Sequence, residues 1–416
     1  MSQQQWSWDK AEEYLLSREL FGMSFDLNRM KAVAEALGRP QDQFDTIHLV
    51  GTNGKSSTTR MAAAILEAHG VASGLYCSPH LTTFAERISI AGTVIEPAAF
   101  GAAVMRAAQA AQIADLKTSS GPITQFEALT VAAYDEFSLR GVEVAVVEAG
   151  LGGRLDATNI LGPGIVGLTS IGLEHTALLG TSIAQIASEK LAVVKDGGTL
   201  VVRQDLDPDV MAEAQRVVCE RDATIVVVDD LWQGQLAATG AYQRGNFTLA
   251  VACCEAYLGE LDSQLVAEVA SKVTIPGRFE IFGHAPLRVL DGAHNPAAIE
   301  VTLGSFDGDI EIVAVVSLLE DKDALAMLEL LLNRCSTVIL TSNSNPRAVD
   351  AASLGELAAQ VGAGLSAVIV ESDPIKALES ATVLAGPERA VLVTGSLSLV
   401  ADLSAQPLQP RRISKF

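Results

Sequence analysis

The chain has 416 residues, of which 49% are hydrophobic, and its formal net charge is −21. This length predicts two or three domains, and a strongly acidic chain without a basic stripe is a poor partner for DNA or another polyanion. No apolar run reaches the roughly 18 residues that a membrane-spanning helix needs, and the N-terminal residues lack the pattern of a signal peptide. The five cysteines form no CxxC pair, which fits a reducing compartment. We therefore expect a cytoplasmic protein that binds neither nucleic acid nor membranes.

Strand and helix patterns alternate along most of the chain, which predicts an α/β fold with parallel-rich sheets. In the first part we expect strands over 46–50, 144–147, 165–170, 200–202 and 224–228, and helices over 57–69, 97–112, 126–139, 183–194 and 246–257. After a Pro-Gly pair a second alternation begins. Its expected strands are 289–290, 312–316, 337–340, 367–370 and 390–393, and its expected helices are 297–303, 324–332, 353–361 and 375–384. These patterns predict a larger domain over residues 1–280 and a smaller Rossmann-like α/β domain over residues 281–416.

The strongest chemical signal is a glycine turn between an apolar strand and a helix, Gly51-Thr-Asn-Gly-Lys-Ser-Ser57. Its glycines allow backbone N–H groups to approach phosphate oxygens, and the start of the following helix favours an anion. Lys55 adds a positive charge, and a serine hydroxyl can bind Mg²⁺. This pattern predicts a P-loop-containing N-terminal ATPase domain. The usual pattern has glycine where Leu49 stands, so an ordinary strand-to-helix turn with a surface lysine is the alternative.

Polar residues also end the next two apolar strands. Glu148 closes the first of them and is followed by a glycine-rich run, while His175 follows the second strand. Ligands bind at the carboxyl ends of parallel strands, so we expect Glu148 to share a Mg²⁺ with the glycine turn. His175 is expected to bind a second metal or to orient a phosphate. The alternatives are a solvated glutamate and a capping histidine.

Several cations are candidates for holding an anionic ligand on this acidic chain, namely Lys55, Arg87, Arg154, Lys190 and Arg278. Lys190 lies in an amphipathic helix beside Glu189, and on chemistry alone such a lysine is expected at the surface. Ser78 and His80 lie in a loop stiffened by proline and could face the same site.

The second half of the chain carries its own polar cluster. Asp291 and His294 follow a short strand at the start of a helix, and Arg278 follows the Pro-Gly pair. Such a cluster could hold the base, ribose or phosphate of a nucleotide. The alternative is a helix-capping turn.

Taken in order, these segments resemble the folylpolyglutamate synthase/dihydrofolate synthase family of the Mur ligase superfamily. The resemblance is carried by Gly51-Thr-Asn-Gly-Lys-Ser-Ser57, Ser78-Pro-His-Leu81, Glu86-Arg-Ile88, Glu148-Ala-Gly-Leu-Gly-Gly-Arg-Leu-Asp-Ala-Thr-Asn159, Ser170-Ile-Gly-Leu-Glu-His-Thr176, Glu189-Lys190, Pro276-Gly-Arg278 and Asp291-Gly-Ala-His-Asn295. It implies an ATP-dependent ligase in which a pteroyl carboxylate attacks the γ-phosphate and L-glutamate then attacks the acyl phosphate. A related ligase with another carboxylate acceptor and a non-catalytic nucleotide-binding protein are the alternatives.

The resemblance also implies roles for individual residues. The implied catalytic residues are Lys55, Glu148, His175 and a carbamylated Lys190, and the implied ATP-binding residues are Gly51, Thr52, Asn53, Gly54, Lys55, Ser56, Ser57, Asn246, Arg278, Asp291 and His294. The implied substrate-binding residues are Ser78, His80, Arg87, Arg154, Asp156 and Ala157, the last two at the pterin. Of two implied Mg²⁺ ions, one is held by Ser57 and Glu148 and the other by Ser78, Glu148 and His175. K⁺ is a further candidate ion.

The implied partners are ATP, L-glutamate and either dihydropteroate or a reduced folate, and we expect a monomer. Several departures from the family pattern lie close to these residues, among them Leu191-Ala-Val193 after Lys190, where the family usually has Ala-Gly-Ile. Ser56 stands where the family usually has glycine, and Glu174 stands where it usually has aspartate. The change at Glu174 adds a methylene group next to His175.

Overall fold

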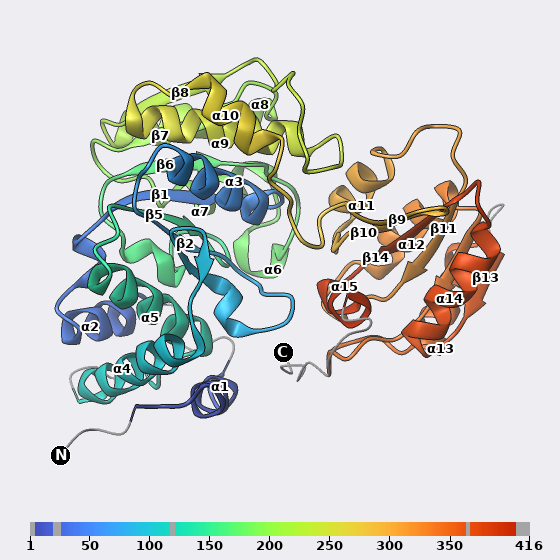
Figure 1. Ribbon diagram of the computed structural model, residues 1–416, viewed down its shortest axis with the longest axis horizontal. Helices are drawn as coiled ribbons and strands as arrows, with labels where there is room; N and C mark the ends of the chain where they lie inside the picture. Colours follow the sequence, from blue (N-terminus) through green and yellow to red (C-terminus); the bar gives the residue numbers. More distant parts are fainter. Residues whose placement is uncertain (1–4, 20–25, 117–120, 363–366, 405–416) are drawn as a thin grey trace. The chain divides into compact units, whose positions relative to one another are not determined.

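The computed structural model describes residues 5–19, 26–116, 121–362 and 367–404. By packing, the chain divides into two units. The first unit consists of Met1–Gln235 and Gly245–Ser271, and the second unit consists of Leu236–Arg244 and Lys272–Phe416. Each unit is a mostly parallel sheet with helices on both faces (Figure 1), which confirms the expected fold class. The domain boundary after residue 280 stays a prediction, because the packing changes unit after Ser271 and also assigns a short earlier segment to the second unit.

The sheet of the first unit has the strand order β4-β3-β2-β5-β1-β6-β7-β8. Its strands are β1 (Asp45–Val50), β2 (Ser73–Tyr76), β3 (Ile88–Ile90), β4 (Thr93–Val94), β5 (Val144–Glu148), β6 (Ile165–Leu168), β7 (Thr199–Arg203) and β8 (Thr224–Val228). Neighbouring strands from β2 to β8 in this order pair in parallel, whereas β3 and β4 form an antiparallel edge. The central strand β1 therefore lies between β5 and β6.

Helices cover both faces of this sheet. They are α1 (Trp8–Leu16), α2 (Asn28–Ala36), α3 (Lys55–Ala68), α4 (Pro97–Asp115), α5 (Gln125–Leu139), α6 (Thr176–Leu179), α7 (Ile183–Leu191), α8 (Pro208–Glu220), α9 (Gln243–Leu258) and α10 (Ser263–Ala270), with short 3₁₀ helices η1 (Pro40–Asp42), η2 (Phe84–Arg87) and η3 (Ala157–Ile160). Local sequence sets several of their ends. For example, Thr124 and Glu127 form a reciprocal capping box that starts α5.

Strand register decides which side chains meet the helix α3. Side chains alternate between the faces of a sheet. Val147 packs with α4 and α5 on one face, and Val50 packs on the same face with α7 and α8. Leu49 faces the opposite side, which α3 and α9 cover. Glu148 is the register partner of Leu49, so its side chain points to the face that carries α3.

The second unit has the strand order β13-β12-β11-β14-β10-β9, in which only β9 pairs antiparallel. Its strands are β9 (Glu280–His284), β10 (Leu287–Leu290), β11 (Ile312–Val316), β12 (Thr337–Leu340), β13 (Ala367–Val370) and β14 (Ala390–Thr394), and its helices are α11 (Pro296–Leu303), α12 (Ala324–Arg334), α13 (Ala351–Val361), α14 (Pro374–Ala385) and α15 (Leu397–Ser404). Every residue of β11 is buried. A continuous apolar strand of this kind is typical of a parallel sheet covered on both faces.

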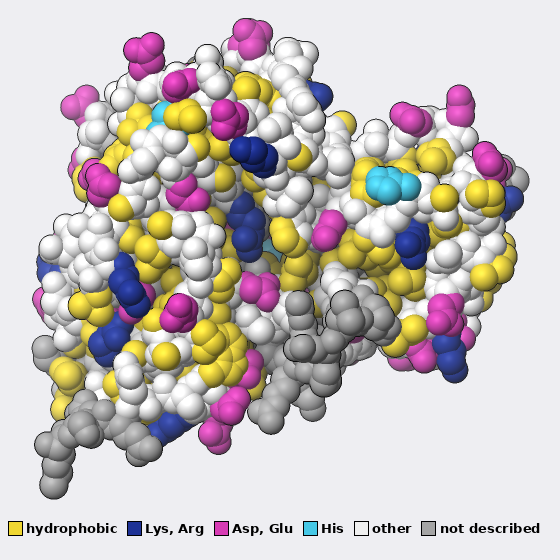
Figure 2. All heavy atoms as spheres, viewed as in Figure 1, with side chains coloured by type: hydrophobic (Ala, Val, Ile, Leu, Met, Phe, Trp, Pro, Cys, Tyr) yellow, Lys and Arg dark blue, Asp and Glu magenta, His cyan; other side chains and the backbone are white. Residues whose placement is uncertain are grey.

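The surface reflects the acidic composition. Figure 2 shows Asp and Glu side chains spread over the visible face of each unit, with Lys and Arg side chains interspersed among them. Within the described ranges, no helix is both long enough and apolar enough to cross a membrane.

Candidate active site

The glycine turn between β1 and α3, residues 51–55, has the backbone of a phosphate loop. Gly51 has a φ of +145° and Gly54 a φ of +89°. Gly54 is the N-cap of α3, and it supplies no side-chain hydrogen bond to the first turn of that helix. A Cβ at Gly54 would lie 2.5 Å from Oδ1 of Asn246 in α9, which places this expected nucleotide-binding residue beside the loop. Because the first N–H groups of a helix need partners from outside the helix, this cap is suited to an anion.

The close approach at Gly51 gives a stability prediction. A Cβ there would lie 2.0 Å from Oγ1 of Thr169 and 2.9 Å from the carbonyl oxygen of Ser170. Gly51→Ala is therefore expected to lower the free energy of unfolding by about 1–3 kcal/mol, measured by urea denaturation. Gly162→Ala is the matched control, because a Cβ at Gly162 meets no atom within 4 Å. Equal stability losses in both variants would contradict this reading.

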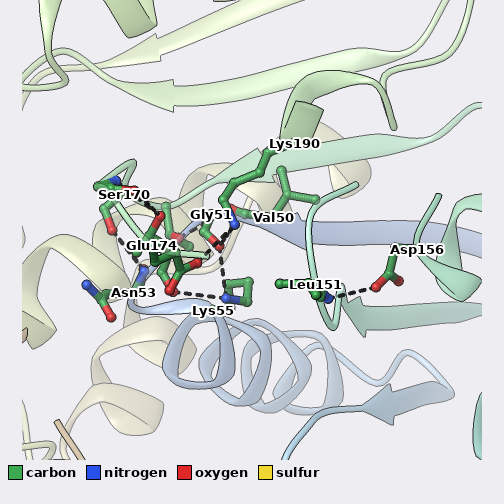
Figure 3. A network of polar contacts seen from close by, with 12 residues as sticks. Val50, Gly51, Asn53, Lys55, Leu151, Asp156, Ser170, Glu174 and Lys190 are labelled. Carbon is green, nitrogen blue, oxygen red and sulfur yellow. Dashed lines mark hydrogen bonds and ion pairs between the residues drawn. The ribbon is translucent and has the colours of Figure 1, made fainter. Parts of the chain in front are cut away.

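The loop that follows β6 is tied directly to the phosphate loop. Thr52 N donates to Ser170 O at 2.6 Å, and Asn53 N donates to Ser170 Oγ at 3.1 Å (Figure 3). Thr52 Oγ1 also accepts from Gly172 N at 3.1 Å. These contacts hold the segment that carries His175 against the nucleotide-binding segment. Sequence reasoning gave Ser170 no role of its own, although its place at the end of a central strand was a signal.

Lys55 and Lys190 approach the phosphate loop from opposite sides of Gly51 (Figure 3). Lys55 Nζ donates to the carbonyl oxygens of Gly51 and Thr52, both at 2.9 Å. Lys190 Nζ donates to Gly51 O at 2.9 Å and pairs with Glu174 Oε1 at 3.2 Å. The Lys190 side chain is 2% exposed, so the expectation of a surface lysine, made on chemistry alone, is wrong. The inner face of α7 carries this lysine into the site.

Burial and a neighbouring charge change the chemistry of Lys190. Burial, and to a lesser degree the positive charge of Lys55, lower the pKa of Lys190 to about 8, although Glu174 opposes the shift. A neutral amine is therefore accessible near neutral pH. Burial alone would raise the pKa of Glu174, but the charges of Lys55, Lys190 and His175 together lower it.

Glu148 meets the start of α3 as the register predicts. Its carboxylate accepts a hydrogen bond from Ser56 Oγ at 2.9 Å and another from Ser78 N at 3.0 Å. Glu148 is 2% exposed, as is Ser57, whereas Ser56 is half-buried. His175 is exposed and caps α6 with a φ of +45°. Because β5 and β6 flank β1, the structure brings Glu148 and His175 to the same end of the sheet as the phosphate loop.

The oxygen ligands around Glu148 fit a magnesium ion that arrives with a nucleotide. Among the described residues, no three side chains of His, Cys, Asp or Glu cluster closely enough to hold a metal by themselves. Mg²⁺ usually takes only one or two protein carboxylates and completes its shell with substrate phosphates and water. One buried carboxylate and a nearby serine hydroxyl beside a phosphate loop match that requirement.

The glycine-rich run after β5 forms a loop organised by Asp156. Its buried carboxylate accepts hydrogen bonds from Leu151 N at 2.8 Å (Figure 3), from Thr158 N at 3.0 Å and from the Thr158 hydroxyl. Backbone donation from Gly150 also acts on it. An ionised carboxylate can accept about four hydrogen bonds. The hydrogen-bond acceptor sites of Asp156 are therefore occupied by donors from its own loop. Ala157, the other expected pterin residue, is buried at the start of η3.

The remaining expected substrate residues are paired within the first unit. Arg87 Nε donates to His80 Nδ1 at 2.9 Å, and both side chains are buried. Burial, followed by the charge of Arg87, holds the pKa of His80 well below its usual range. His80 is therefore a neutral imidazole with its proton on Nε2. Arg154 is exposed and pairs with Glu189 of α7 at 3.1 Å, which ties the glycine-rich loop to the helix of Lys190.

The second unit assembles the other nucleotide-binding candidates. Asp291 accepts from the hydroxyl of Tyr242 at 2.8 Å, from Phe279 N at 3.0 Å and from Ala293 N at 2.8 Å. Arg278 Nη1 and His294 Nδ1 both contact the carbonyl oxygen of Gly292, at 3.2 Å and 2.8 Å. Sequence reasoning missed Tyr242, because no local pattern links it to a carboxylate 49 residues away.

Comparisons with known proteins agree with this arrangement. Residues 277–397 match the family described as Mur ligase, glutamate ligase domain. A dihydrofolate synthase/folylpolyglutamate synthase from Mycobacterium tuberculosis is 34% identical over 374 residues, which cover 79% of this chain and 76% of the relative. A probable bifunctional folylpolyglutamate synthase/dihydropteroate synthase from Haloferax volcanii is 31% identical over 94% of this chain. The chain spans only 50% of that relative's length.

Solved structures share the whole fold. Mycobacterium tuberculosis folylpolyglutamate synthase, complexed with ADP and AMPPCP, has a TM-score of 0.87 at 32% identity and covers 96% of this chain and 98% of its own. Escherichia coli FolC in complex with DHPP and ADP has a TM-score of 0.85 at 26% identity, with coverage of 96% and 97%. A bifunctional folylpolyglutamate synthase/dihydrofolate synthase from Yersinia pestis, complexed with AMPPNP and a Mn ion, has a TM-score of 0.83 at 28% identity, with coverage of 96% and 97%. From its sequence, its fold and its site, the chain belongs to the dihydrofolate synthase/folylpolyglutamate synthase family.

Proposed function

We propose that this protein is an ATP-dependent ligase that joins L-glutamate to the carboxylate of a pteroyl or folyl substrate. The observation that carries the proposal is the phosphate loop on the central strand β1, flanked by Glu148 from β5 and by the His175 loop from β6. Lys55 and a buried Lys190 meet at the same loop. Family membership supports the reaction, and dihydrofolate synthesis is the proposed primary activity, with folylpolyglutamate synthesis as a second activity.

The chain's own residues supply binding, orientation and charge. The N-terminus of α3 and Lys55 hold the phosphates of ATP, so that the γ-phosphate faces the substrate carboxylate. Attack by that carboxylate gives an acyl phosphate and ADP, and attack by the glutamate amine then gives the amide and releases phosphate. Donors that are positioned in advance stabilise the developing charge without reorganising during the reaction. Arg278, Asp291 and His294 of the second unit are proposed to contact the nucleotide as well.

The proposal includes two magnesium ions. We assign one Mg²⁺ to Glu148 and a phosphate-loop serine, and a second to Ser78, Glu148 and His175. When bound, such ions offset the repulsion between the substrate carboxylate and the triphosphate. The oxygen-rich surroundings of Glu148 support the first assignment. The second rests on the family resemblance and on the shared sheet end, and so does K⁺ as an additional ion.

A direct assay tests the function. The protein is incubated with ATP, Mg²⁺ and L-glutamate, together with either dihydropteroate or tetrahydrofolate, and ADP release and product mass are followed. The expected result is ADP formation that depends on the pteroyl substrate, with a product heavier by one glutamyl residue. ADP release without a new amide product would contradict the proposal. Gel filtration of the same sample tests the expected monomer.

Asp156 gives a prediction about substrate choice. We propose that the 150–158 loop contacts the pterin and that Asp156 sets its shape, since several loop donors converge on this carboxylate. Asp156→Ala leaves these buried donors unpaired, which is expected to destabilise the loop by about 1–3 kcal/mol of free energy. The two acceptors are proposed to bind in separate subsites, with this loop serving dihydropteroate. The KM for dihydropteroate is therefore expected to rise more than the KM for tetrahydrofolate, measured by steady-state kinetics with both acceptors. Both acceptors carry a pterin, so equal changes for both would argue against separate subsites. A wild-type protein that uses tetrahydrofolate but never dihydropteroate would refute the pterin role of this loop.

A further inference from the structure

Two adjacent serines lie in the first turn of α3, directly after Lys55, and the structure distinguishes between them. The Ser56 hydroxyl donates to Glu148 Oε1 at 2.9 Å and lies 3.5 Å from the carbonyl oxygen of Ser78. Ser57 is 2% exposed and lies on the buried side of α3. Consecutive helical residues point about 100° apart, so the two hydroxyls do not face the same neighbour. Ser56 is the half-buried member of the pair, as a residue that meets an incoming ligand should be.

The position of the Glu148 carboxylate is fixed independently of Ser56. Its register opposite Leu49 directs the side chain to the α3 face of the sheet. The backbone N–H of Ser78 then holds Oε2 at 3.0 Å. Oε1 is thereby turned toward Ser56, at the mouth of the phosphate loop. Two protein oxygens from different elements thus lie side by side, next to Lys55.

Their spacing fits two neighbouring ligands of one magnesium ion. In an octahedral Mg²⁺ site with bonds of about 2.0–2.1 Å, adjacent ligand oxygens lie about 2.9 Å apart, and the Ser56–Glu148 distance is 2.9 Å. In phosphate loops the hydroxyl that binds the metal follows the lysine directly, and Ser56 follows Lys55. We propose that Ser56, and not Ser57, supplies the phosphate-loop hydroxyl to the Mg²⁺ bound with the nucleotide. This assignment rests on the proposed function only in requiring that the site binds a metal–nucleotide complex.

A measurement of metal affinity can distinguish the roles of Ser56 and Ser57 without an assay of catalytic turnover. Mn²⁺ replaces Mg²⁺ as a paramagnetic probe, and its affinity for the full-length protein is measured by electron paramagnetic resonance in the presence of AMPPNP. Ser56→Ala is expected to weaken Mn²⁺ binding about 10- to 100-fold, whereas Ser57→Ala leaves it close to wild type. Ser56→Thr keeps the hydroxyl and should restore most of the affinity. The affinity for AMPPNP in EDTA is measured for each variant, so that a loss of metal binding is distinguished from a loss of nucleotide binding.

The opposite pattern overturns the assignment. If Ser57→Ala loses the metal and Ser56→Ala keeps it, or if neither substitution changes Mn²⁺ affinity, Ser56 is not the ligand. Thermal unfolding of each variant checks that the loss is not a folding defect, and recovery in Ser56→Thr shows that the hydroxyl itself is required. A wild-type protein that binds Mn²⁺ and AMPPNP but forms no amide would refute the ligase proposal and leave the Ser56 assignment standing. A wild-type protein that binds no Mn²⁺ with AMPPNP would refute both.

Discussion

Lys55→Ala and Glu148→Ala are each expected to lower turnover by about 10²–10³-fold or more while leaving the fold intact. Lys55 reaches the loop carbonyls from the start of α3, so its charge lies where the terminal phosphates of ATP are expected. Glu148 is a buried carboxylate at the adjacent strand end. Removing it takes away the main negative charge available to a magnesium ion at this site. The measurement is ADP release at saturating ATP, glutamate and pteroyl substrate.

Matched substitutions make this result interpretable. Lys376→Ala removes an exposed lysine from α14 and should leave the rate unchanged. Glu148→Gln keeps the size of the side chain but not its charge, so it should be nearly as inactive as Glu148→Ala. Circular dichroism and the thermal midpoint establish that each variant is folded. More than half of the wild-type rate in Lys55→Ala or in Glu148→Ala would refute the phosphate and metal assignments.

The sequence predicted several of the strands that are buried on both faces. The run Ile312–Val316 is continuously apolar and the run at 46–50 is mostly apolar, and the structure has strands over Ile312–Val316 and Asp45–Val50. The edge strands Ile88–Ile90 and Thr93–Val94 were missed, because two or three residues cannot establish an alternating pattern. Short elements of this kind depend on pairing with a neighbour that the local sequence does not reveal.

In the site, too, features formed by contiguous residues were predictable from the sequence, and contacts between distant residues were not. The phosphate loop was predictable because its glycines, lysine and hydroxyls are contiguous. The Ser56–Glu148 contact joins residues 92 positions apart and follows from strand register, which no local pattern encodes. Lys190 is the clearest case. Its amphipathic helix is compatible with either an exposed or an inward lysine, and only the packing of α7 against the sheet decides between them.

Lys190 is expected to carry a carbamate in the active protein. Carbamylation requires a neutral amine that attacks CO₂, and burial lowers the pKa of Lys190 to about 8. The modified side chain would be an anion beside Lys55, which replaces the repulsion between two cations by an attraction. Because the neutral fraction of the amine grows as the pH rises through about 8, the carbamate content should fall as the pH is lowered below that value. Carbon-13 NMR after equilibration with labelled CO₂ measures this content directly.

Substitutions test whether activity depends on the carbamate or on the unmodified amine of Lys190. Lys190→Ala is expected to lose about 10²–10³-fold in turnover and to recover part of it when a small carboxylate such as acetate is added to the buffer. Lys195→Ala is the matched control, because Lys195 is a half-buried lysine that bonds to Asn159 and not to the phosphate loop. Lys195→Ala should remain active and should not respond to added carboxylate.

Glu174 lies 3.2 Å from Lys190 Nζ and would repel a carbamate, so Glu174→Gln should raise the carbamate content. An unlabelled Lys190 in fully active protein would show that the amine, or its ion pair with Glu174, is the working form.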